Sequence, residues 1–495
     1  MNRLKNLRGL LLVIALLVIL YSLLPLGTAL QFGGDEGLEL CKGFMCSKGF
    51  ALYTQIWNDQ PPIFTLILSH AFKILGPSLL VARLIVVGFG LLFLGTFFRL
   101  VNQRLGQWPA FWAAFFLMAS PVVFQISASV MLEVPAFAIA LLSACFLFKW
   151  SKQPHWGWLL ASGFIMGIAL QTKLTAILFL PAMLVEIVLT RQPDRDRLWW
   201  KTAFVNLVQW GTAAAITFAM IGLFWARGSF QSSLKSHFSE HLVSGMGRPE
   251  DFPFDLSIVW NHFECVTAAT VGVLIIAKRK RWRSFAFPIV LLLTGLTIHA
   301  VHRPWWSYYY LHLALPLAWL AGFAVSEAIL IISQLLSASR FHVSSSKTWQ
   351  GIALCALTAL VLVRSERRLE ATVEDMRQRL SVDADPVVAK MKVYADRTHW
   401  VYSQIEIYPF HARLPMPPEL TVVVLKRFWS GQITVREIVE TCKRYQTEQL
   451  LLKRGNIGKE WDGILKDYFV AYQNNDFVLY VTKRLEQNGK GVNGI

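Results

Sequence analysis

The sequence predicts a polytopic α-helical membrane protein that ends in a small α/β domain. The chain of 495 residues is 55% hydrophobic and has a mean hydropathy of +0.45, which is more apolar than a soluble protein of this size. Apolar runs of about 16–25 residues, long enough to span a bilayer, recur up to Arg364. After Arg364 the composition becomes charged, and helical and strand-like patterns alternate. These observations divide the chain into a membrane module, residues 1–364, and an extracytoplasmic α/β domain, residues 365–495.

The first apolar run follows a basic start, MNRLKNLRG, and extends to about Gly27. A signal peptide is the alternative reading, but no A-x-A cleavage site is evident and the run is long enough to span. We therefore expect a retained first helix whose N-terminus lies in the cytoplasm.

Basic loops determine the rest of the predicted topology. Short loops rich in Lys and Arg lie at 99–104, 149–152, 191–201, 278–283 and 340–347. Such loops are enriched on the cytoplasmic side, so two crossings must separate each pair. The expected crossings are 79–98, 109–126, 134–150, 157–172, 174–190, 203–225, 257–277, 285–300, 308–335 and 349–364. Together with the first helix they give about 11 spans, or roughly 10 to 13 if helices are split or missed.

The segment 61-PPIFTLILSHAFKILG-76 does not fit as a crossing. It is short and contains His70 and Lys73, and a crossing here would place every later basic loop outside. We predict a juxtamembrane or re-entrant helix. The large first loop, 28–78, then lies outside the cell. The other outer segments are 127–133, 171–175, 228–256 and 300–307.

The C-terminal domain combines helical and strand patterns. Helices are expected at 366–380, 386–395, 434–445 and 458–468, and strands at 420–425, 449–453, 469–472 and 477–482. The last two strands flank 473-QNND-476, which predicts a hairpin turn.

The net charge of +17 does not indicate a nucleic-acid partner. The basic residues are dispersed in short loops, as the positive-inside rule requires, and they would be attracted to anionic membrane lipids. The six cysteines match no zinc-site spacing. A disulfide between Cys41 and Cys46 in the outer loop is left open.

Five carboxylates gather at the outer ends of the first spans. They are Asp35, Glu36, Glu39, Asp59 and Glu133. Solvated loop acids are the alternative explanation. However, Asp35 follows Gly33-Gly34, where the backbone can turn tightly, and it shares one helical face with Glu39. Like charges on one face oppose ionisation unless a cation or ligand intervenes, which indicates a general base or a metal ligand.

Cations are expected opposite these acids. Lys173 lies in 169-ALQTKLTA-176 between two apolar runs, where it is either a snorkelling anchor or the partner of an anion. The segment 299-HAVHRPWWSYYYLHL-313 supplies His302 and Arg303 among tyrosines. Arg can bind phosphate through two parallel hydrogen bonds. Acids and cations at one membrane face suit a lipid-linked phosphate substrate.

The pattern resembles the GT-C class of glycosyltransferases, in particular the group of protein O-mannosyltransferases and bacterial lipid A aminoarabinose transferases. The matching segments are Asp35-Glu36, 49-GFALYTQIWNDQPPIF-64, 132-LEVPAF-137, 166-MGIALQTKLTA-176 and 302-HRPWWSYYYLHLALP-316. The resemblance covers about residues 1–320. The chain departs from it at Gln60, where the aminoarabinose transferases have Lys, and at Glu133, which replaces Asp.

The resemblance implies a GT-C-like fold and a glycosyltransferase in the bacterial inner or plasma membrane. It would move a sugar from a polyprenyl-phosphate donor to a hydroxyl of a glycan, lipid or protein, with inversion, on the extracytoplasmic face. The implied catalytic residues are Asp35 and Glu36, and the implied phosphate ligands are Lys173, Arg303 and His302. The implied sugar or acceptor contacts are Tyr53, Asp59, Tyr309, Tyr310 and His312. A divalent ion (Mg, Mn or Zn) would lie near Asp35, Glu36 and Glu133.

Two other functions remain open. A lipid-linked oligosaccharide ligase or polymerase of the same fold would differ only in its acceptor. A membrane transporter would carry polar groups near the bilayer midplane and inverted repeats, and neither is evident in the sequence.

Overall fold

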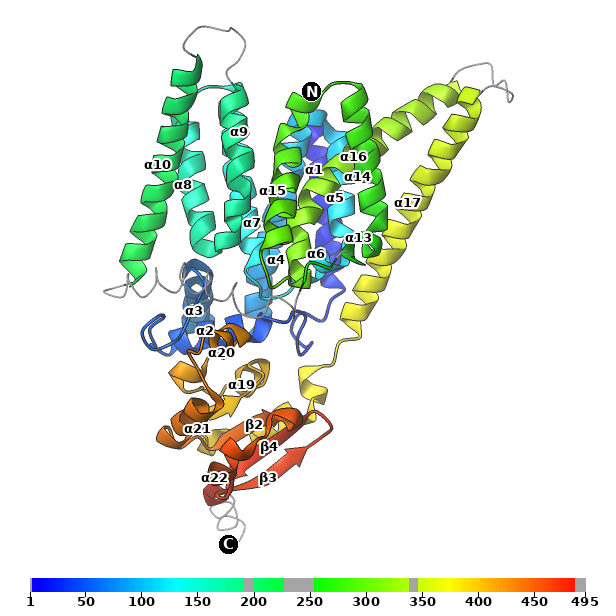
Figure 1. The fold of residues 1–495 in the computed structure, drawn as a ribbon. Coiled ribbons are helices and arrows are strands. Elements are labelled where there is room, and N and C mark those ends of the chain that lie inside the picture. The colour runs from blue at the N-terminus through cyan, green and yellow to red at the C-terminus, as the bar shows by residue number, and fades with distance from the viewer. Residues whose placement is uncertain (1, 191–198, 227–252, 256, 338–345, 486–495) are drawn as a thin grey trace.

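The computed structural model describes residues 2–190, 199–226, 253–255, 257–337 and 346–485. These residues form a helical bundle, a layer of two short helices at one end of it, and a small mixed domain beyond that layer (Figure 1). The predicted outer loop 228–256 and the basic loops near 195 and 343 lie mostly outside the described residues.

Thirteen α-helices make up the bundle in the described part of the chain. They are α1 (Asn2–Ser22), α4 (Leu79–Leu105), α5 (Gln107–Met118), α6 (Pro121–Ile126), α7 (Glu133–Lys152), α8 (Trp156–Thr172), α9 (Leu180–Thr190), α10 (Trp199–Ala226), α13 (Ser257–Asn261), α14 (Phe263–Lys278), α15 (Ala286–Val301), α16 (Tyr310–Ser337) and α17 (Ser346–Arg377). Among the described residues, five helices are long and apolar enough to cross a membrane, and shorter apolar helices accompany them. The prediction of an integral membrane protein is confirmed at this level, and the number of about 11 spans stays a prediction.

Several predicted spans are interrupted. The apolar run 109–126 forms α5 and α6, which meet at Ser120 and Pro121. Proline lacks an amide N–H and is tolerated at the first turn of a helix rather than inside it. The run 174–190 likewise begins as a 3-10 helix, η1 (Leu174–Phe179), before α9.

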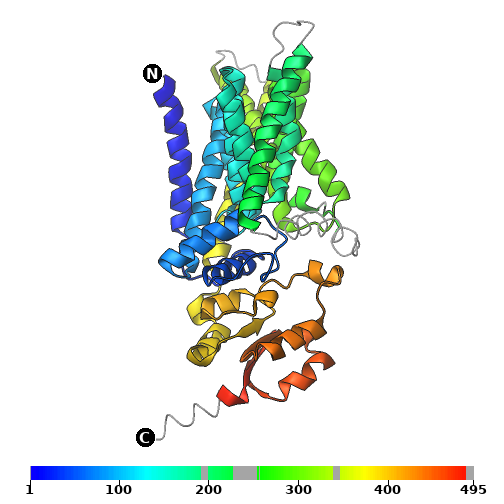
Figure 2. The same cartoon turned by 90° about the vertical axis from the view of Figure 1, so that its left-hand side faces the viewer.

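Helices α2 (Glu36–Ser47) and α3 (Ile63–Leu75) form the layer between the bundle and the C-terminal domain (Figure 1, Figure 2). They pack against each other through a buried face of α3 that includes Phe64, Leu68 and Phe72. Helix α3 corresponds to the segment 61–76, and it lies at the edge of the bundle, as predicted.

Basic segments of the described chain meet at the opposite end of the bundle, where the N-terminus lies (Figure 1). Lys152 Nζ donates to the carbonyl of Gln103 at 2.8 Å, and Arg104 forms an ion pair with Glu186. These contacts join the C-terminal ends of α4, α7 and α9. The charge pattern therefore predicted correctly that these loops share one side.

The C-terminal domain contains a four-stranded sheet of order β1-β2-β4-β3. The strands are β1 (Val401–Ser403), β2 (Gln449–Lys453), β3 (Tyr468–Gln473) and β4 (Phe477–Thr482). Strand β1 runs parallel to β2, and β4 runs antiparallel to β2 and β3. The helices of the domain are α18 (Pro386–Val393), α19 (Ile407–Ala412), α20 (Leu425–Trp429), α21 (Val435–Arg444) and α22 (Asp462–Leu465). The hairpin around QNND is confirmed, and helix α17 continues past residue 364 as far as Arg377.

The predicted strand at 420–425 is wrong. Leu420 ends a 3-10 helix, η7 (Pro418–Leu420), and Leu425 begins α20, so only residues 421–424 lie outside helices, and they pair with no strand in the described structure. Arg427 Nη1 donates instead to the carbonyls of Val422 at 2.6 Å and Glu419 at 2.9 Å. β-Branched residues favour an extended backbone, but here a side chain supplies the hydrogen bonds that a neighbouring strand would supply.

The first loop attaches the C-terminal domain to the bundle. Leu30 N donates to Leu380 O, and Val382 N donates to Thr28 O, each at 2.7 Å. On α2, a Cβ atom added to Gly37 would lie 2.6 Å from the Ile407 amide nitrogen. This close backbone approach requires glycine and fixes the start of α19 against α2.

Candidate active site

A cavity of about 730 Å³ lies where the bundle, α2 and the C-terminal domain meet. Its volume is in the range of small-molecule binding sites, roughly 300–1,000 Å³. Charged and aromatic side chains from all three parts line it, among them Asp35, Glu39, Lys42, Asp59, Lys173, His299, His302, Tyr308, Tyr309, His312, Glu406 and Lys426. Segments that are far apart in the sequence therefore share one chamber at the end of the bundle.

Asp35 lines this cavity from the N-cap position of α2. The preceding Gly33 packs so closely that a Cβ atom there would overlap the side chains of Ser129 and Met131. The Tyr308 side chain interacts with the Asp35 carboxylate from the other wall. The Gly-Gly turn thus places one acid in the cavity, as the sequence predicted.

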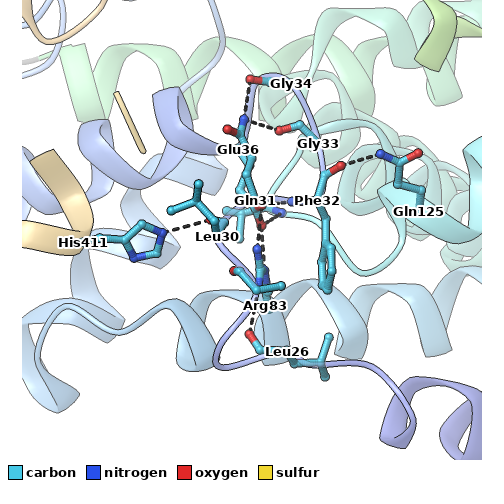
Figure 3. Close-up of polar contacts among 12 residues, drawn as sticks. Leu26, Leu30, Gln31, Phe32, Gly33, Gly34, Glu36, Arg83, Gln125 and His411 are labelled. Carbon is cyan, nitrogen blue, oxygen red and sulfur yellow. Dashed lines mark hydrogen bonds and ion pairs between the residues drawn. The ribbon is translucent and has the colours of Figure 1, made fainter. Parts of the chain in front are cut away.

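Glu36 lies beside Asp35 in sequence but points away from the cavity. Its carboxylate forms a fully buried, bidentate ion pair with Arg83, with Nε–Oε1 and Nη2–Oε2 distances of 2.9 Å each (Figure 3). It also accepts hydrogen bonds from the amides of Phe32 at 2.7 Å and Val130 at 3.0 Å. The expectation that Glu36 faces the substrate is therefore contradicted, because Arg83 and two amides occupy its oxygens.

The same cluster holds the backbone that carries Asp35. Arg83 Nη1 donates to the carbonyls of Leu26 at 3.0 Å and Ala29 at 2.9 Å. Gln31 Nε2 donates to Gly34 O at 2.9 Å, and His411 of the C-terminal domain bonds to Leu30 O at 2.9 Å (Figure 3). Side chains from three parts of the molecule thus fix the loop before α2.

Lys173 and Glu133 form a buried ion pair at the cavity wall. Lys173 follows the last residue of α8, and Glu133 is the first residue of α7. Lys173 Nζ lies 5.4 Å from the centroid of the Tyr308 ring, within the range of a cation–π contact. The cation and the acid singled out in the sequence are therefore partners.

Two further lysines were not predicted as site residues. Lys42 is buried on α2 and donates to Glu39 at 2.8 Å and to Asn58 at 3.2 Å. Lys426, at the start of α20, pairs with Asp59 at 3.0 Å. The i, i+3 spacing of Glu39 and Lys42 could have indicated the first pair, whereas the second joins two domains and leaves no local signal.

Glu406 is a third residue that the sequence reasoning missed. It immediately precedes α19 and lines the cavity from the C-terminal domain. Burial raises the pKa of its carboxyl group to about 8, and the charge of Asp35 adds to this effect. The cavity therefore holds acids from both the bundle side and the domain side.

Comparisons with known proteins agree with this architecture. Residues 59–225 match the model of a family described as dolichyl-phosphate-mannose-protein mannosyltransferase. The fold is similar to ArnT from Cupriavidus metallidurans bound to undecaprenyl phosphate, with a TM-score of 0.67 and 15% identity over 96% of this chain and 98% of that chain. The apo state of the same ArnT gives a TM-score of 0.64 at 15% identity, with the same coverage.

An oligosaccharyltransferase from Archaeoglobus fulgidus is similar to a lesser degree. Its TM-score is 0.58 at 13% identity, over 97% of this chain and 74% of that chain. No curated protein sequence matches the chain. The chain has the GT-C fold. The predicted resemblance and the predicted enzyme class, a membrane glycosyltransferase, are confirmed by the family match and this fold.

Some predicted residues of this GT-C chain do not line the cavity. Arg303 is absent from the lining, although its neighbour His302 is part of it. Tyr53 donates from its hydroxyl to Gln60 O at 2.8 Å. Tyr310 points elsewhere and stacks on His262, with a centroid distance of 3.6 Å. The predicted contacts Asp59, Tyr309 and His312 do line the GT-C cavity.

The residues predicted to hold a divalent ion do not converge. Glu36 is paired with Arg83 and Glu133 with Lys173, so only Asp35 of the three presents its carboxylate to the cavity. Among the residues that the structure describes, no three His, Cys, Asp or Glu side chains are grouped so as to hold a metal ion. The predicted ion therefore does not fit these residues, and no catalytic step is assigned to it.

The two cysteines of the first loop are not paired. Both lie on α2, and each thiol is buried and free. Cys41 Sγ donates to the carbonyl of Glu406 at 3.0 Å. This contact belongs to the interface between α2 and α19.

Proposed function

We propose that this membrane glycosyltransferase transfers a sugar from a polyprenyl-phosphate donor to a hydroxyl acceptor on the extracytoplasmic face. The observation that carries the proposal is the cavity itself, in which Asp35 shares one chamber with Lys42, Lys173 and Lys426 at the end of the bundle. The structural relative ArnT was solved with undecaprenyl phosphate. The matched family is described by a dolichyl-phosphate-linked donor.

Donor binding is assigned to the bundle wall. Apolar side chains of Leu174, Ile177 and Leu178 line the cavity next to Lys173, and Ile177 is 53% exposed on the bundle surface. A polyprenyl chain could follow this apolar strip while its phosphate lies beside Lys173. An ammonium group has three donors, so Lys173 can bond to Glu133 and to a phosphate together.

Lys426 takes the place of the lysine that the aminoarabinose transferases have at the position of Gln60. Gln60 stands where the aminoarabinose transferases have Lys, and it lines the cavity next to Asp59. Lys426 reaches Asp59 from the C-terminal domain. We assign a second phosphate contact to Lys426, so that the C-terminal domain completes the donor site.

The proposed reaction is a single displacement. Asp35 accepts the proton of the acceptor hydroxyl, whose oxygen forms a bond to the anomeric carbon. The bond between that carbon and the phosphate oxygen breaks, and the polyprenyl phosphate leaves with its charge stabilised by Lys173 and Lys426. Attack on the face opposite the leaving group inverts the anomeric centre. Preorganised charge and general-base help are the two sources of acceleration.

The proposed orientation follows from the two ends of the bundle. The described basic segments and the N-terminal helix end lie at one end, and α2 and the C-terminal domain, which line the cavity, lie at the other (Figure 1). The positive-inside rule assigns the first end to the cytoplasm. The cavity and the C-terminal domain then face outward.

Glycan analysis tests the proposed function. Mass spectrometry of envelope glycans and lipids from a deletion strain should reveal one missing sugar, which returns when the wild-type chain is supplied. An unchanged set of envelope glycans and lipids would contradict the proposal.

A further inference from the structure

Two buried histidines form a pair on the bundle wall. His299 in α15 and His312 in α16 are 3% and 2% exposed, and His299 Nε2 lies 2.9 Å from His312 Nδ1. Both rings line the cavity. Their outer nitrogens, His299 Nδ1 and His312 Nε2, have no hydrogen-bond partner among the described residues.

Chemistry limits what such a pair can bind. A neutral imidazole has one N–H donor and one acceptor nitrogen. The bond between the rings uses one donor and one acceptor, so the outer nitrogens present one donor and one acceptor in either tautomer. A sugar hydroxyl both donates and accepts, whereas an ionised phosphate only accepts. The pair therefore matches a hydroxyl group better than a phosphate.

Aromatic contacts fix the two rings in place. Tyr309 stacks on both, with centroid distances of 5.4 Å to His299 and 5.2 Å to His312. Trp305 lies edge-on to His299 at 4.7 Å, and Phe137 stacks on His312 at 5.0 Å. These ring contacts hold the imidazoles but leave their outer nitrogens unpaired. Burying an unpaired polar group is unfavourable, which points to a ligand that completes the bonds.

The pair lies close to the proposed donor phosphate. Tyr309 contacts Tyr308 edge-on at 4.9 Å, and Tyr308 in turn lies under Lys173. In a sugar phosphate the ring is joined directly to the phosphate oxygen. A sugar whose phosphate is bound at Lys173 would thus have its hydroxyls beside this wall.

We propose that the His299–His312 pair is a binding subsite for a hydroxyl group of the donor sugar and that it contributes to sugar selection. This inference rests on the proposed function. The two residues do not act on the reacting atoms, and their contribution is to affinity for the sugar.

Binding measurements with purified protein test the inference. The probes are undecaprenyl phosphate alone and undecaprenyl phosphate carrying mannose, glucose or galactose, together with the monodeoxy analogues of the sugar that binds most tightly. His312→Phe should weaken binding of the sugar-bearing lipid by about tenfold, with little change for undecaprenyl phosphate. For one deoxy analogue, the affinity of the wild type should fall by a similar factor. His312→Phe should bind that analogue no more weakly than it binds the complete sugar lipid, because the two changes remove the same hydrogen bond.

His312→Gln is the conservative control. Glutamine retains a donor and an acceptor, so it should recover part of the affinity, and the melting temperature should be measured for both variants. The inference would be overturned if His312→Phe weakened the binding of undecaprenyl phosphate and of the sugar-bearing lipid equally. It would also be overturned if removing the same hydroxyl lowered the affinity of both the wild type and His312→Phe. If the His312 variants do not fold, the deoxy analogues are compared on the wild-type protein alone. Equal affinity of the wild type for all analogues would then also overturn the inference. A wild type that binds none of the lipids contradicts the proposed function instead.

Discussion

Adjacent residues in the first loop have opposite surroundings. Asp35 lines the cavity, whereas Glu36 is fully buried against Arg83. The sequence predicted that both acids face the substrate, because a pair of neighbouring carboxylates carries no information about which one turns inward. The Arg83 partner lies on another helix, 47 residues away, and no local pattern reveals that contact.

Replacing Glu36 tests this division at the residue scale. Glu36→Gln should lower the free energy of unfolding by about 3–5 kcal/mol, because it leaves the buried Arg83 charge without its partner. The measurement is thermal unfolding in detergent. Asp35→Asn, which changes a cavity residue in the same loop, is the matched control and should melt like the wild type. A Glu36→Gln variant with wild-type stability and no activity would contradict the structural role.

Glu406 predicts a pH dependence of stability. Its pKa is raised from an ordinary 4.5 to about 8, so the folded state holds this proton more tightly than the unfolded state. The stability linked to this proton is full below about pH 4.5 and is lost as the pH rises to about 8. Glu406→Gln cannot lose a proton, so its melting temperature should exceed that of the wild type more at about pH 9 than at about pH 5.

An exposed acid in the same domain provides the control for this experiment. Glu460 is exposed and does not line the cavity, so Glu460→Gln should follow the wild type at each pH. A difference between Glu406→Gln and wild type that does not vary with pH would contradict the raised pKa.

Helices and strands differed in how far the sequence predicted them. Helix α3 and the start of α2 followed from an apolar run of limited length and from a Gly-Gly turn. The hairpin of β3 and β4 followed from its turn residues. The segment 420–425 was misassigned because its β-branched residues favour a strand, whereas its two ends belong to the helices η7 and α20 and the Val422 carbonyl accepts a hydrogen bond from Arg427. Lys426 on α20 was missed because its contact with Asp59 joins two domains, and a local sequence pattern does not reveal such a contact.

The contact between α2 and α19 gives a prediction at the element scale. Gly37→Ala places a Cβ atom 2.6 Å from the Ile407 amide nitrogen, closer than van der Waals contact allows, so the two helices must separate. We expect a loss of about 1–3 kcal/mol in stability and a lower transfer rate, because Asp35 and Glu406 face the same cavity from these helices. Gly455→Ala is the control, since nothing lies within 4 Å of a Cβ atom there. Equal behaviour of the two variants in melting and transfer assays would contradict a rigid contact.

The whole molecule is polarised along the bundle. The N-terminus and the described basic segments lie at one end, and α2, α3 and the C-terminal domain lie at the other (Figure 1, Figure 2). The cavity is lined by α2 and the C-terminal domain and therefore belongs to the second end. Charge and hydropathy predicted this arrangement from the sequence, because both are averaged over long segments. The composition of the cavity could not be predicted in full, since it depends on how the C-terminal domain docks on the first loop.

Reporter fusions test the orientation of the whole molecule. A reporter that is active only outside the cytoplasm should be active when fused after Ile495 and inactive when fused in the loop after Lys152. The reason is that the described C-terminal domain, which precedes the first fusion, and Lys152 lie at opposite ends of the bundle (Figure 1), and basic loops stay in the cytoplasm. Activity at both positions, or the reverse pattern, would contradict the proposed orientation.

The central claim is that Asp35 serves a sugar transfer in this cavity. The most direct measurement supplies Asp35→Asn to the deletion strain and quantifies the missing glycan. Asp396→Asn, an exposed acid of the C-terminal domain, is the control. We predict that Asp35→Asn restores less than about 1% of the wild-type glycan, although its amount in the membrane, its melting temperature and its affinity for undecaprenyl phosphate are unchanged. Asp396→Asn should restore all of it, and restoration at the wild-type level by Asp35→Asn would contradict the claim.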